Sequence, residues 1–327
     1  MMKVVGFELP GGPDVLQVKE LPTPILGINE IMIEVEAAGL NVFDTWFRQD
    51  IPFYRYTFNA YLGYECAGTV VAVSSNIHEF KVGDEVCAIL LRGGAYAEFV
   101  VVPPSEVRRI PSRVSLVQAA TLPEASRLTI FALSVLPNVT PGKTFLIHGT
   151  AGGFDIIAIQ YFKHIGCKVF VVAGTEEKLQ LCKTLGAEVC INYREEDFCK
   201  RVKAETGGKG VDVILDDSER DHFKKNVDCL ARSGSLVVLG HKIGSWVNVD
   251  LSILMKKDIK IKGVDLQYLG YGEMMRLWSD VEAKIWPLIE EGHIEPVIGR
   301  AFTFNEAAEA HRALEENNVP GKLLLVP

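Results

Sequence analysis

Apolar residues divide the chain into two regions with different patterns. Residues 1 to about 122 carry short runs in which apolar and polar positions alternate, separated by turns rich in glycine and proline. This spacing predicts the strands of a partly open β-barrel, because one face of each strand is buried and the other is solvated. The clearest runs are Ile31–Val35, Gly68–Val73 and Ala95–Val102.

Between residues 123 and 267, apolar runs alternate with helical patterns. They predict an α/β region with a doubly wound parallel sheet that is buried on both faces. The predicted strands are Thr144–His148, Lys168–Val172, Glu188–Ile191, Val211–Leu215, Leu236–Gly240 and Ile259–Val264. The remaining residues predict a helix at Met274–Glu291, a strand at Pro296–Arg300, a helix at Asn305–Asn317 and a closing strand at Lys322–Val326.

The segment Thr144–Gln160 predicts a buried strand, a glycine-rich turn and an amphipathic helix. This order creates an anion site, because the first N–H groups of the helix are unpaired and glycines let a pyrophosphate approach the main chain. The next strand is followed by Ala173-Gly174-Thr175, where a dinucleotide fold contacts the adenosine ribose. The pattern therefore predicts a nicotinamide dinucleotide site.

Asp155 stands where the last glycine of such a turn is expected. A carboxylate about 4 Å from a phosphate charge costs roughly 1 kcal/mol in water-like surroundings and about 4 kcal/mol at an effective dielectric constant of 20. Asp is also a favoured helix N-cap whose charge suits the positive end of a helix. Asp155 could therefore occupy the anion site itself, so dinucleotide binding and its loss are both open.

Composition narrows the class of protein. A net charge of −8 at pH 7 argues against a broad nucleic-acid surface. No apolar run approaches the roughly 20 residues of a membrane helix, and the N-terminus lacks the pattern of a signal peptide. The seven cysteines are scattered and never spaced C-x-x-C, which favours reduced thiols. We expect a cytoplasmic protein with no nucleic-acid or membrane partner.

A set of short motifs is spread over essentially the whole chain. They are Pro10–Leu16, Ala38–Asn41 with Asp44 and Arg48, Leu62–Gly68, Phe80–Val86, Ala119–Ala125, Leu146–Gly149, Glu177–Leu179, Leu185–Ala187 and Ile191–Phe198. Each motif alone is weak, but the combination is specific. Together they resemble the zinc-free quinone oxidoreductase (zeta-crystallin-like) branch of the medium-chain dehydrogenase/reductase superfamily.

The resemblance implies a GroES-like β-barrel domain formed by residues 1–122 and 268–327, and a Rossmann domain formed by residues 123–267. It implies an active cleft between these two domains. It also implies a homodimer paired through the last Rossmann strand, near Ile259–Val264.

The resemblance also argues against a metal. Zinc-bearing relatives carry Cys where this chain has Asn41 and His where it has Tyr64, and they insert a four-cysteine lobe after the position of Cys87. An amide and a phenol do not replace a thiolate and an imidazole as zinc ligands. The implied reaction is hydride transfer from NADPH to a small apolar quinone or α,β-unsaturated carbonyl, with Asn41 polarising the acceptor oxygen. Asn41 as a turn residue that bonds its own backbone is an equal alternative.

NADPH is favoured over NADH because no carboxylate follows the second strand to hold the ribose 2′-hydroxyl. Lys178 lies one helical turn on, where the resemblance implies a contact with the 2′-phosphate; the alternative is a solvated lysine on the helix surface. The implied catalytic residues are Asn41, Trp46, Tyr54, Tyr64 and Thr129. The implied cofactor-binding residues are Thr129, Ala151, Gly152, Gly153, Phe154, Asp155, Gly174, Thr175, Lys178, Tyr193, Ser218, Gly240, His241 and Lys322.

Further departures from the family pattern gather around the expected cofactor groove. Asp216-Asp217-Ser218-Glu219-Arg220 replaces the usual Asp-x-x-Gly-Gly, and Arg127 adds an unusual charge. A second hypothesis follows: Asp155 and Glu219 impair the groove, and the fold serves as a non-redox cyclase or isomerase, or as a non-catalytic binding protein. Glu65 is a further candidate, either as a functional carboxylate or as a structural one.

Overall fold

The computed structural model describes residues 1–51, 61–136, 139–149, 151–217, 222–240 and 246–327. They form two compact units, which we name the barrel unit (Met1–Ala125 with Trp278–Pro327) and the parallel-sheet unit (Ser126–Leu277). The sequence-based domain boundaries, 122/123 and 267/268, remain a prediction. Among the helices of the described residues, none is long and apolar enough to cross a membrane.

The barrel unit combines a two-stranded hairpin with a seven-stranded sheet. Strands β1 and β2 pair antiparallel, and the larger sheet has the order β14-β15-β3-β4-β5-β7, with β6 pairing β3. Its strands are β1 Met2–Gly6, β2 Gln17–Leu21, β3 Ile31–Gly39, β4 Glu65–Val73, β5 Glu85–Ile89, β6 Phe99–Val102, β7 Val107–Arg109, β14 Ile298–Thr303 and β15 Lys322–Val326. Its helices are α1 Val42–Arg48, α2 Leu116–Ala119, α10 Trp286–Glu290 and α11 Ala307–Glu316.

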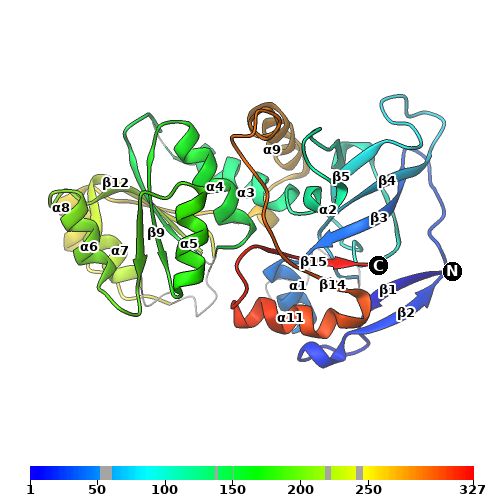
Figure 1. Cartoon of the computed structure of the whole chain (residues 1–327), viewed down its shortest axis with the longest axis horizontal. Helices are drawn as coiled ribbons and strands as arrows, with labels where there is room; N and C mark the ends of the chain where they lie inside the picture. The colour runs from blue at the N-terminus through cyan, green and yellow to red at the C-terminus, as the bar shows by residue number, and fades with distance from the viewer. Residues whose placement is uncertain (52–60, 137–138, 150, 218–221, 241–245) are drawn as a thin grey trace. The chain divides into compact units, whose positions relative to one another are not determined.

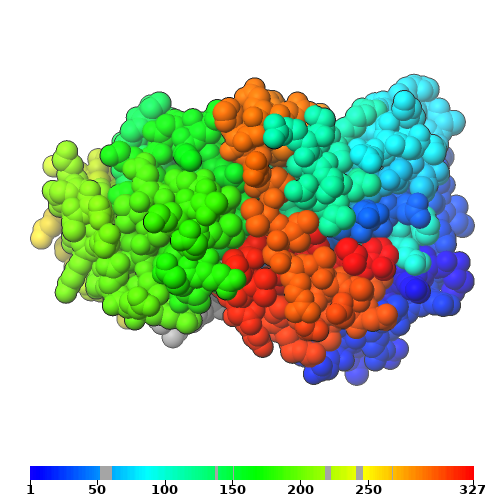
Figure 2. All heavy atoms as spheres, in the orientation of Figure 1, coloured from blue at the N-terminus to red at the C-terminus, as the bar shows by residue number. Residues whose placement is uncertain are grey.

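Both ends of the chain build this unit. The last strand, β15, pairs antiparallel with β3, with Leu324 opposite Gly39 and Leu325 opposite Ala38. Figure 2 shows the C-terminal segments, red and orange, among the blue and cyan N-terminal segments. The alternation in Ile31–Val35 confirms the predicted strand, since Ile31 and Ile33 are fully buried in the core and Glu34 is exposed.

The parallel-sheet unit has six strands in the order β10-β9-β8-β11-β12-β13, all paired parallel. The strands are β8 Thr144–His148, β9 Lys168–Ala173, β10 Val189–Asn192, β11 Val211–Asp216, β12 Leu230–Val238 and β13 Lys260–Gly263. The helices are α4 Gly153–His164, α5 Glu176–Leu185, α6 Phe198–Glu205, α7 Phe223–Cys229 and α8 Leu251–Lys257, and α3 Pro123–Ser134 leads into the unit. Figure 1 shows α4 and α5 on one face of the sheet and α6, α7 and α8 on the other.

This arrangement confirms the predicted doubly wound sheet and places its topological switch point between β8 and β11. The chain runs outward from β8 through β9 to β10, then crosses back to β11 beside β8. Ligands of open α/β sheets bind at the carboxyl ends of the strands at such a point. The turns after β8, β9 and β11 are therefore the parts of this unit to inspect for a site.

Three sequence-based elements differ most from the structure, while other predicted elements, such as Gly68–Val73 and Pro296–Arg300, are shifted by two or three residues. The helix predicted at Met274–Glu291 is two helices, α9 Tyr271–Lys284 and α10, because Pro287 has no N–H to continue the hydrogen-bond ladder. The strand predicted at Leu236–Gly240 begins earlier, at Leu230, because its polar first half pairs with β11 across an irregular register. The strand predicted at Ala95–Val102 is shorter, β6, and begins at Phe99.

Candidate functional site

The turn between β8 and α4 presents backbone N–H groups at the switch point. Ala151 adopts a left-handed conformation, with φ of 53°, and Gly152 is the N-cap of α4. Gly152, Gly153 and Phe154 are half-buried, and Gly152 caps the helix without a side chain of its own. The first N–H groups of α4 therefore carry the partial positive charge of a helix N-terminus at a partly open surface.

Asp155 is not the N-cap residue of this helix, although its residue type favours that position. It is the third residue of α4, and its Oδ2 accepts a hydrogen bond from the Gly152 N–H at 3.1 Å. Its side chain is only 1% exposed, and a Cβ added to Gly149 would lie 3.5 Å from the Asp155 Cγ. The carboxylate therefore packs inward against Gly149 and takes one of the N–H groups that an anion would use.

Lys178 lies on the same side of the sheet as this carboxylate, because α5 packs against α4. Burial raises the pKa of the Cys182 thiol, the charge of Asp155 raises it further, and the charge of Lys178 lowers it. Both charges therefore act on one buried sulfur. Lys178 is 4% exposed, so the alternative of a solvated lysine on the helix surface is wrong.

Small residues also follow the end of β9, where the adenosine end of a dinucleotide is expected. Thr175 is the N-cap of α5, and its Oγ1 accepts a hydrogen bond from the Lys178 N–H at 3.4 Å. A Cβ added to Gly174 would lie 3.0 Å from the hydroxyl of Tyr193 and 3.1 Å from Nε of Arg194. Tyr193 and Arg194 thus lie directly over Gly174.

Arg194 is the functional candidate that the sequence reasoning missed. Its side chain is exposed, and within the described ranges its guanidinium forms no ion pair; the nearest aromatic contact is the Tyr193 ring, at 5.9 Å from the ring centroid. The available signal was a basic residue directly after Tyr193, past the carboxyl end of β10. A cation held at the ribose end of a dinucleotide groove suits a phosphate.

A buried polar chain joins the ends of β8 and β11. His148 Nε2 and Asn226 Oδ1 are 2.6 Å apart, and Asn226 Nδ2 donates to Asp216 Oδ2 at 2.8 Å. His148 and Asp216 are neighbours in the sheet register. The rings of His148, Tyr193 and Phe198 each lie 5.0–5.2 Å from the ring of His222. These hydrogen bonds and ring contacts hold α7 against the switch point and give His148 a structural role.

The barrel unit holds a closed cluster of three buried polar side chains, Asn41, Glu65 and Lys322. Lys322 Nζ lies 2.7 Å from both Asn41 Oδ1 and Glu65 Oε1, and Asn41 Nδ2 donates to Glu65 Oε1 at 2.9 Å. Glu65 Oε2 accepts from the Glu124 N–H at 2.8 Å. The second donor of Asn41 makes only a 3.4 Å contact with the Gly39 carbonyl. The structure therefore joins Asn41 and Lys322, which the sequence reasoning put in separate groups.

Asp44 extends this cluster into α1. Its carboxylate accepts hydrogen bonds from the N–H groups of Asn41 and Gly63, both at 2.9 Å, and from the Tyr96 hydroxyl at 3.0 Å. Burial raises the pKa of Asp44 from 3.8 to about 6, and these hydrogen bonds limit the rise. Asn41 is thus the N-cap of α1 in a capping box with Asp44.

The remaining predicted residues fall into three groups. Trp46 and Tyr64 both contact Phe43 in the barrel unit, with ring centroids 5.5 and 6.4 Å apart. Thr129 is fully buried in α3, and Gly240 follows β12, where a Cβ would lie 2.8 Å from the Asp217 carbonyl oxygen. Tyr54, Ser218, Glu219 and His241 lie outside the described residues. Within the described part of the chain, no cluster of three or more His, Cys, Asp or Glu side chains has a metal-binding arrangement.

Two family comparisons agree with this architecture. Residues 27–112 match the alcohol dehydrogenase GroES-like domain, and residues 155–282 match a family described as zinc-binding dehydrogenase. Asn41 and Tyr64, the positions that bear on zinc, lie outside the second match.

Individual relatives match over the full length. Quinone oxidoreductase 1 of Escherichia coli (strain K12) is 32% identical, with 99% of each chain covered. The 2-haloacrylate reductase of a Burkholderia species is 30% identical, covering 97% of this chain and 96% of that protein. The crystal structure of Escherichia coli quinone oxidoreductase complexed with NADPH has a TM-score of 0.90 and 32% identity, covering 99% of this chain and all of that one.

These matches identify the barrel unit as GroES-like and the parallel-sheet unit as Rossmann-like. They cover the turn after β8, the end of β9 and the Asn41 cluster together, so the resemblance includes the candidate site as well as the scaffold. The chain belongs to the quinone oxidoreductase family of the medium-chain dehydrogenase/reductase superfamily.

Proposed function

We propose that this protein is an NADPH-dependent reductase that transfers hydride to a quinone or an α,β-unsaturated carbonyl without zinc. The observation that carries the proposal is the end of β9, where Gly174 and Thr175 carry no carboxylate and Arg194, close to Gly174, offers an exposed guanidinium. A carboxylate at this place selects NADH, whereas a cation selects the 2′-phosphate. Names of relatives, quinone oxidoreductase and 2-haloacrylate reductase, favour an electron-poor carbon as the hydride acceptor.

The described residues fit a dinucleotide. Gly152, Gly153 and Phe154 would face the pyrophosphate with half-buried N–H groups, and the Asp155 carboxylate is turned inward from that surface. Gly174, Thr175, Lys178, Tyr193 and Arg194 would hold the adenosine end, and Thr129 and Gly240 belong to the proposed nicotinamide end. NADPH, when bound, supplies the hydride.

On the acceptor side, Asn41 is the proposed polarising residue. The Lys322 ammonium donates to its Oδ1 at 2.7 Å, which draws electron density from the amide and strengthens its N–H groups as donors. One of those donors has only the 3.4 Å contact with Gly39 and can serve an acceptor oxygen. Trp46 and Tyr64 would add an apolar surface. Lys322 would provide the positive charge that zinc provides in the zinc-bearing relatives.

A second candidate is a non-redox enzyme or a binding protein on the same fold. One observation favours it: the Asp155 carboxylate already occupies the Gly152 N–H, a donor that a pyrophosphate would need. Under this alternative, NADPH binds no better than an unrelated nucleotide. The exposed guanidinium of Arg194 argues for the reductase instead, because the alternative gives that residue no role.

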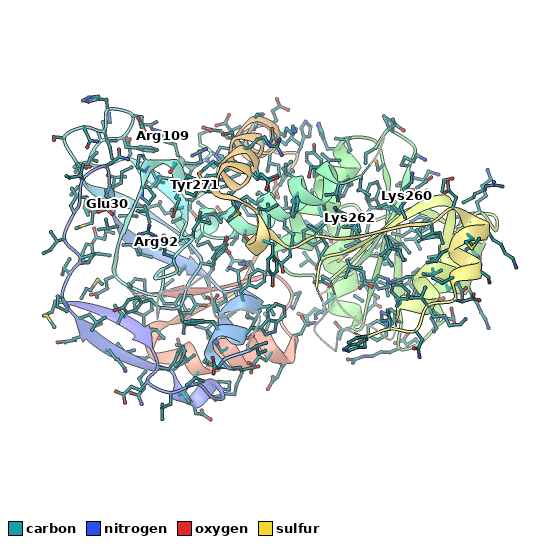
Figure 3. The ribbon with its side chains drawn as sticks, turned by 180° about the vertical axis from the view of Figure 1, so that it is seen from behind. Glu30, Arg92, Arg109, Lys260, Lys262 and Tyr271 are labelled. Carbon is teal, nitrogen blue, oxygen red and sulfur yellow. The ribbon has the colours of Figure 1, made fainter. Side chains whose placement is uncertain are left out.

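We also propose that the protein is a homodimer paired through β13. This strand is the last of the sheet and is exposed along its length; Figure 3 labels its Lys260 and Lys262. Ile261 of β13 is exposed, and the residues that precede the strand in the sequence include the exposed apolar side chains of Trp246, Leu251 and Met255. We expect Ile261→Asp to give a monomer by sedimentation, while Ile25→Asp, at an exposed site in the barrel unit, leaves the dimer intact. A monomeric parent protein would refute this proposal.

The reductase proposal is tested by following NADPH oxidation with a panel of quinones and enones after metal chelation. We expect turnover that chelation leaves unchanged and that NADH supports poorly. Turnover that vanishes on chelation and returns with zinc would contradict the zinc-independent mechanism. A complete lack of turnover together with a lack of NADPH binding would support the second candidate.

A further inference from the structure

Two cysteines of the parallel-sheet unit lie together although 30 positions separate them in the sequence. Cys199 is the second residue of α6 and Cys229 is the last residue of α7, and these helices pack side by side (Figure 1). Both belong to one hydrophobic cluster, with Cys199 7% exposed and Cys229 fully buried. The packing of α6 on α7 brings the two thiols close enough for each to change the pKa of the other.

The two helix ends make the thiols chemically unequal. Cys199 sits in the first turn of α6, where the helix dipole and unpaired N–H groups favour a thiolate. Cys229 ends α7, where the dipole disfavours a thiolate, and its Sγ lies 3.5 Å from the Asn226 carbonyl oxygen, which is a second acceptor for its single proton when Cys199 is not ionised. The geometry therefore assigns the anion to Cys199 and the proton to Cys229.

Basic side chains face the pair from α6 and α8. Lys203 is one turn beyond Cys199, and its charge lowers the pKa of both thiols. Lys257 Nζ donates to the carbonyls of Val227, Asp228 and Leu230 at 3.1, 2.7 and 2.9 Å, which brings its charge to the end of α7.

The acidic groups nearby are largely engaged. Asp197 pairs with Lys225 at 3.1 Å and also accepts from the Lys200 N–H, and Asp228 pairs with Lys224 at 3.0 Å. Their charges raise the pKa of Cys199, but the hydrogen bond from Cys229 outweighs them. The net pKa of Cys199 is lowered to about 7, and that of Cys229 is raised.

We propose that Cys199 and Cys229 form a redox modification site, in which hydroperoxides convert the two thiols into a disulfide. Cys199 is the attacking thiolate and Cys229 is the resolving thiol. Low-pKa cysteines next to a second thiol have this chemistry. The site is separate from the reductase chemistry and does not depend on it.

The reaction balances in two steps. The Cys199 thiolate attacks the peroxide, an S–O bond forms, the O–O bond breaks, and the leaving alkoxide or hydroxide takes a proton. Cys199 is then a sulfenic acid and the peroxide is reduced to an alcohol or water. The Cys229 sulfur attacks the sulfenic sulfur, the disulfide forms, and the Cys229 proton leaves with the hydroxyl group as water.

Cys190 provides an internal comparison. It is more exposed than Cys199, yet burial of its sulfur and the charge of Glu176 raise its pKa, with Lys183 opposing. Burial likewise raises the pKa of Cys66, Cys87, Cys167 and Cys182. If solvent exposure alone decided reactivity, Cys190 would be oxidised first. If the nearby positive charges and the neighbouring Cys229 thiol decide it, Cys199 is oxidised first.

The experiment treats reduced full-length protein with hydrogen peroxide, blocks remaining thiols with N-ethylmaleimide, and digests with trypsin without reductant. Cys199 lies in the tryptic peptide Glu195–Lys200, Cys229 in Asn226–Arg232 and Cys190 in Thr184–Arg194. We expect the first two peptides linked by a disulfide, with the third alkylated. A sulfinic acid on Cys199 without a link, or oxidation at Cys190 first, would overturn the proposal.

Variants separate the two roles. In Cys229→Ser, a sulfenic acid on Cys199 should accumulate and be trapped by dimedone; in Cys199→Ser, Cys229 should stay reduced. The pH midpoint of iodoacetamide labelling at Cys199 should lie near 7 and rise in Lys203→Gln, while Lys200→Gln on the same helix leaves it unchanged. Equal pH midpoints of labelling for Cys199 and Cys190 would contradict the assignment of the thiolate to Cys199. This labelling is done on the parent protein, so it does not depend on a variant that folds.

Discussion

The two units differ in where their candidate site residues carry charge. In the barrel unit, the Lys322 ammonium is enclosed, with Asn41 and Glu65 each 2.7 Å away. In the parallel-sheet unit, two charged side chains lie at the carboxyl edge of the sheet, which we name the open edge: Arg194 is exposed without an ion pair in the described residues, and Asp155 is turned inward. The closed cluster therefore stabilises its own fold, whereas the open edge can recognise a charged ligand.

Breaking the closed cluster should have the largest effect. Lys322→Met leaves the Glu65 carboxylate buried without its cation, and we expect a loss of about 3–5 kcal/mol in unfolding free energy. Chemical unfolding followed by tryptophan fluorescence measures it, because Trp46, Trp278 and Trp286 all lie in the barrel unit. The double variant Lys322→Met/Glu65→Gln should recover part of the loss. A cost below about 1 kcal/mol would show that the pair is not a structural cluster.

Asp44 gives the closed cluster a pH dependence. Because its pKa rises from 3.8 to about 6 on folding, the folded protein binds this proton more tightly than the unfolded chain. Its contribution to stability is full below pH 3.8, is lost as pH rises toward 6 and is constant above that. With about 1.4 kcal/mol per pKa unit, the change is roughly 3 kcal/mol.

Asp44→Asn should remove this slope, which is measured from unfolding free energies between pH 4 and 6. The comparison uses the slope of unfolding free energy against pH in the parent protein and in Asp44→Asn, because the other titratable groups are the same in both. Identical slopes would contradict the raised pKa of Asp44.

The open edge is tested by Arg194→Gln. If the guanidinium meets a 2′-phosphate, its loss removes a charged hydrogen bond of about 1.5–3 kcal/mol, so NADPH affinity should fall roughly ten- to hundredfold. NADH affinity should not change. Arg201→Gln is the matched control, because Arg201 pairs with Glu205 on α6 at 2.8 Å. Equal losses for NADPH and NADH would exclude a role for Arg194 in choosing between them.

Asp155→Asn has the smallest expected effect. The substitution removes a negative charge near the proposed phosphate position and keeps the size of the side chain. The carboxylate faces inward, so we expect a gain of about 1 kcal/mol, which is a several-fold rise in NADPH affinity by calorimetry. A gain of a thousandfold would show that Asp155 blocks the groove in the parent protein.

The sequence predicted the scaffold well where burial is uniform. Thr144–His148 agrees with β8 at both ends, because a continuous apolar run has no alternative face. The break at Pro287 was missed because the apolar spacing continues through it. The fold class and the family were also predicted, because the motifs that carry the resemblance are spread over the whole chain.

The site was predicted less well, for geometric reasons. Asn41 and Lys322 are 281 residues apart, so no local pattern could show that their side chains meet. The inward rotation of Asp155 depends on the space left by Gly149, which the residue types alone do not give. Arg194 was overlooked because its role depends on lying over Gly174 rather than on its own neighbours in the sequence.

The choice of cofactor at the open edge is tested by a calorimetric titration of the purified protein with NADPH and, separately, NADH. We expect micromolar NADPH binding that is at least about tenfold tighter than NADH binding, because the 2′-phosphate gains a charged hydrogen bond. Equal or tighter binding of NADH would contradict the proposed role of the open edge. No binding of NADPH at millimolar concentration would contradict the reductase itself.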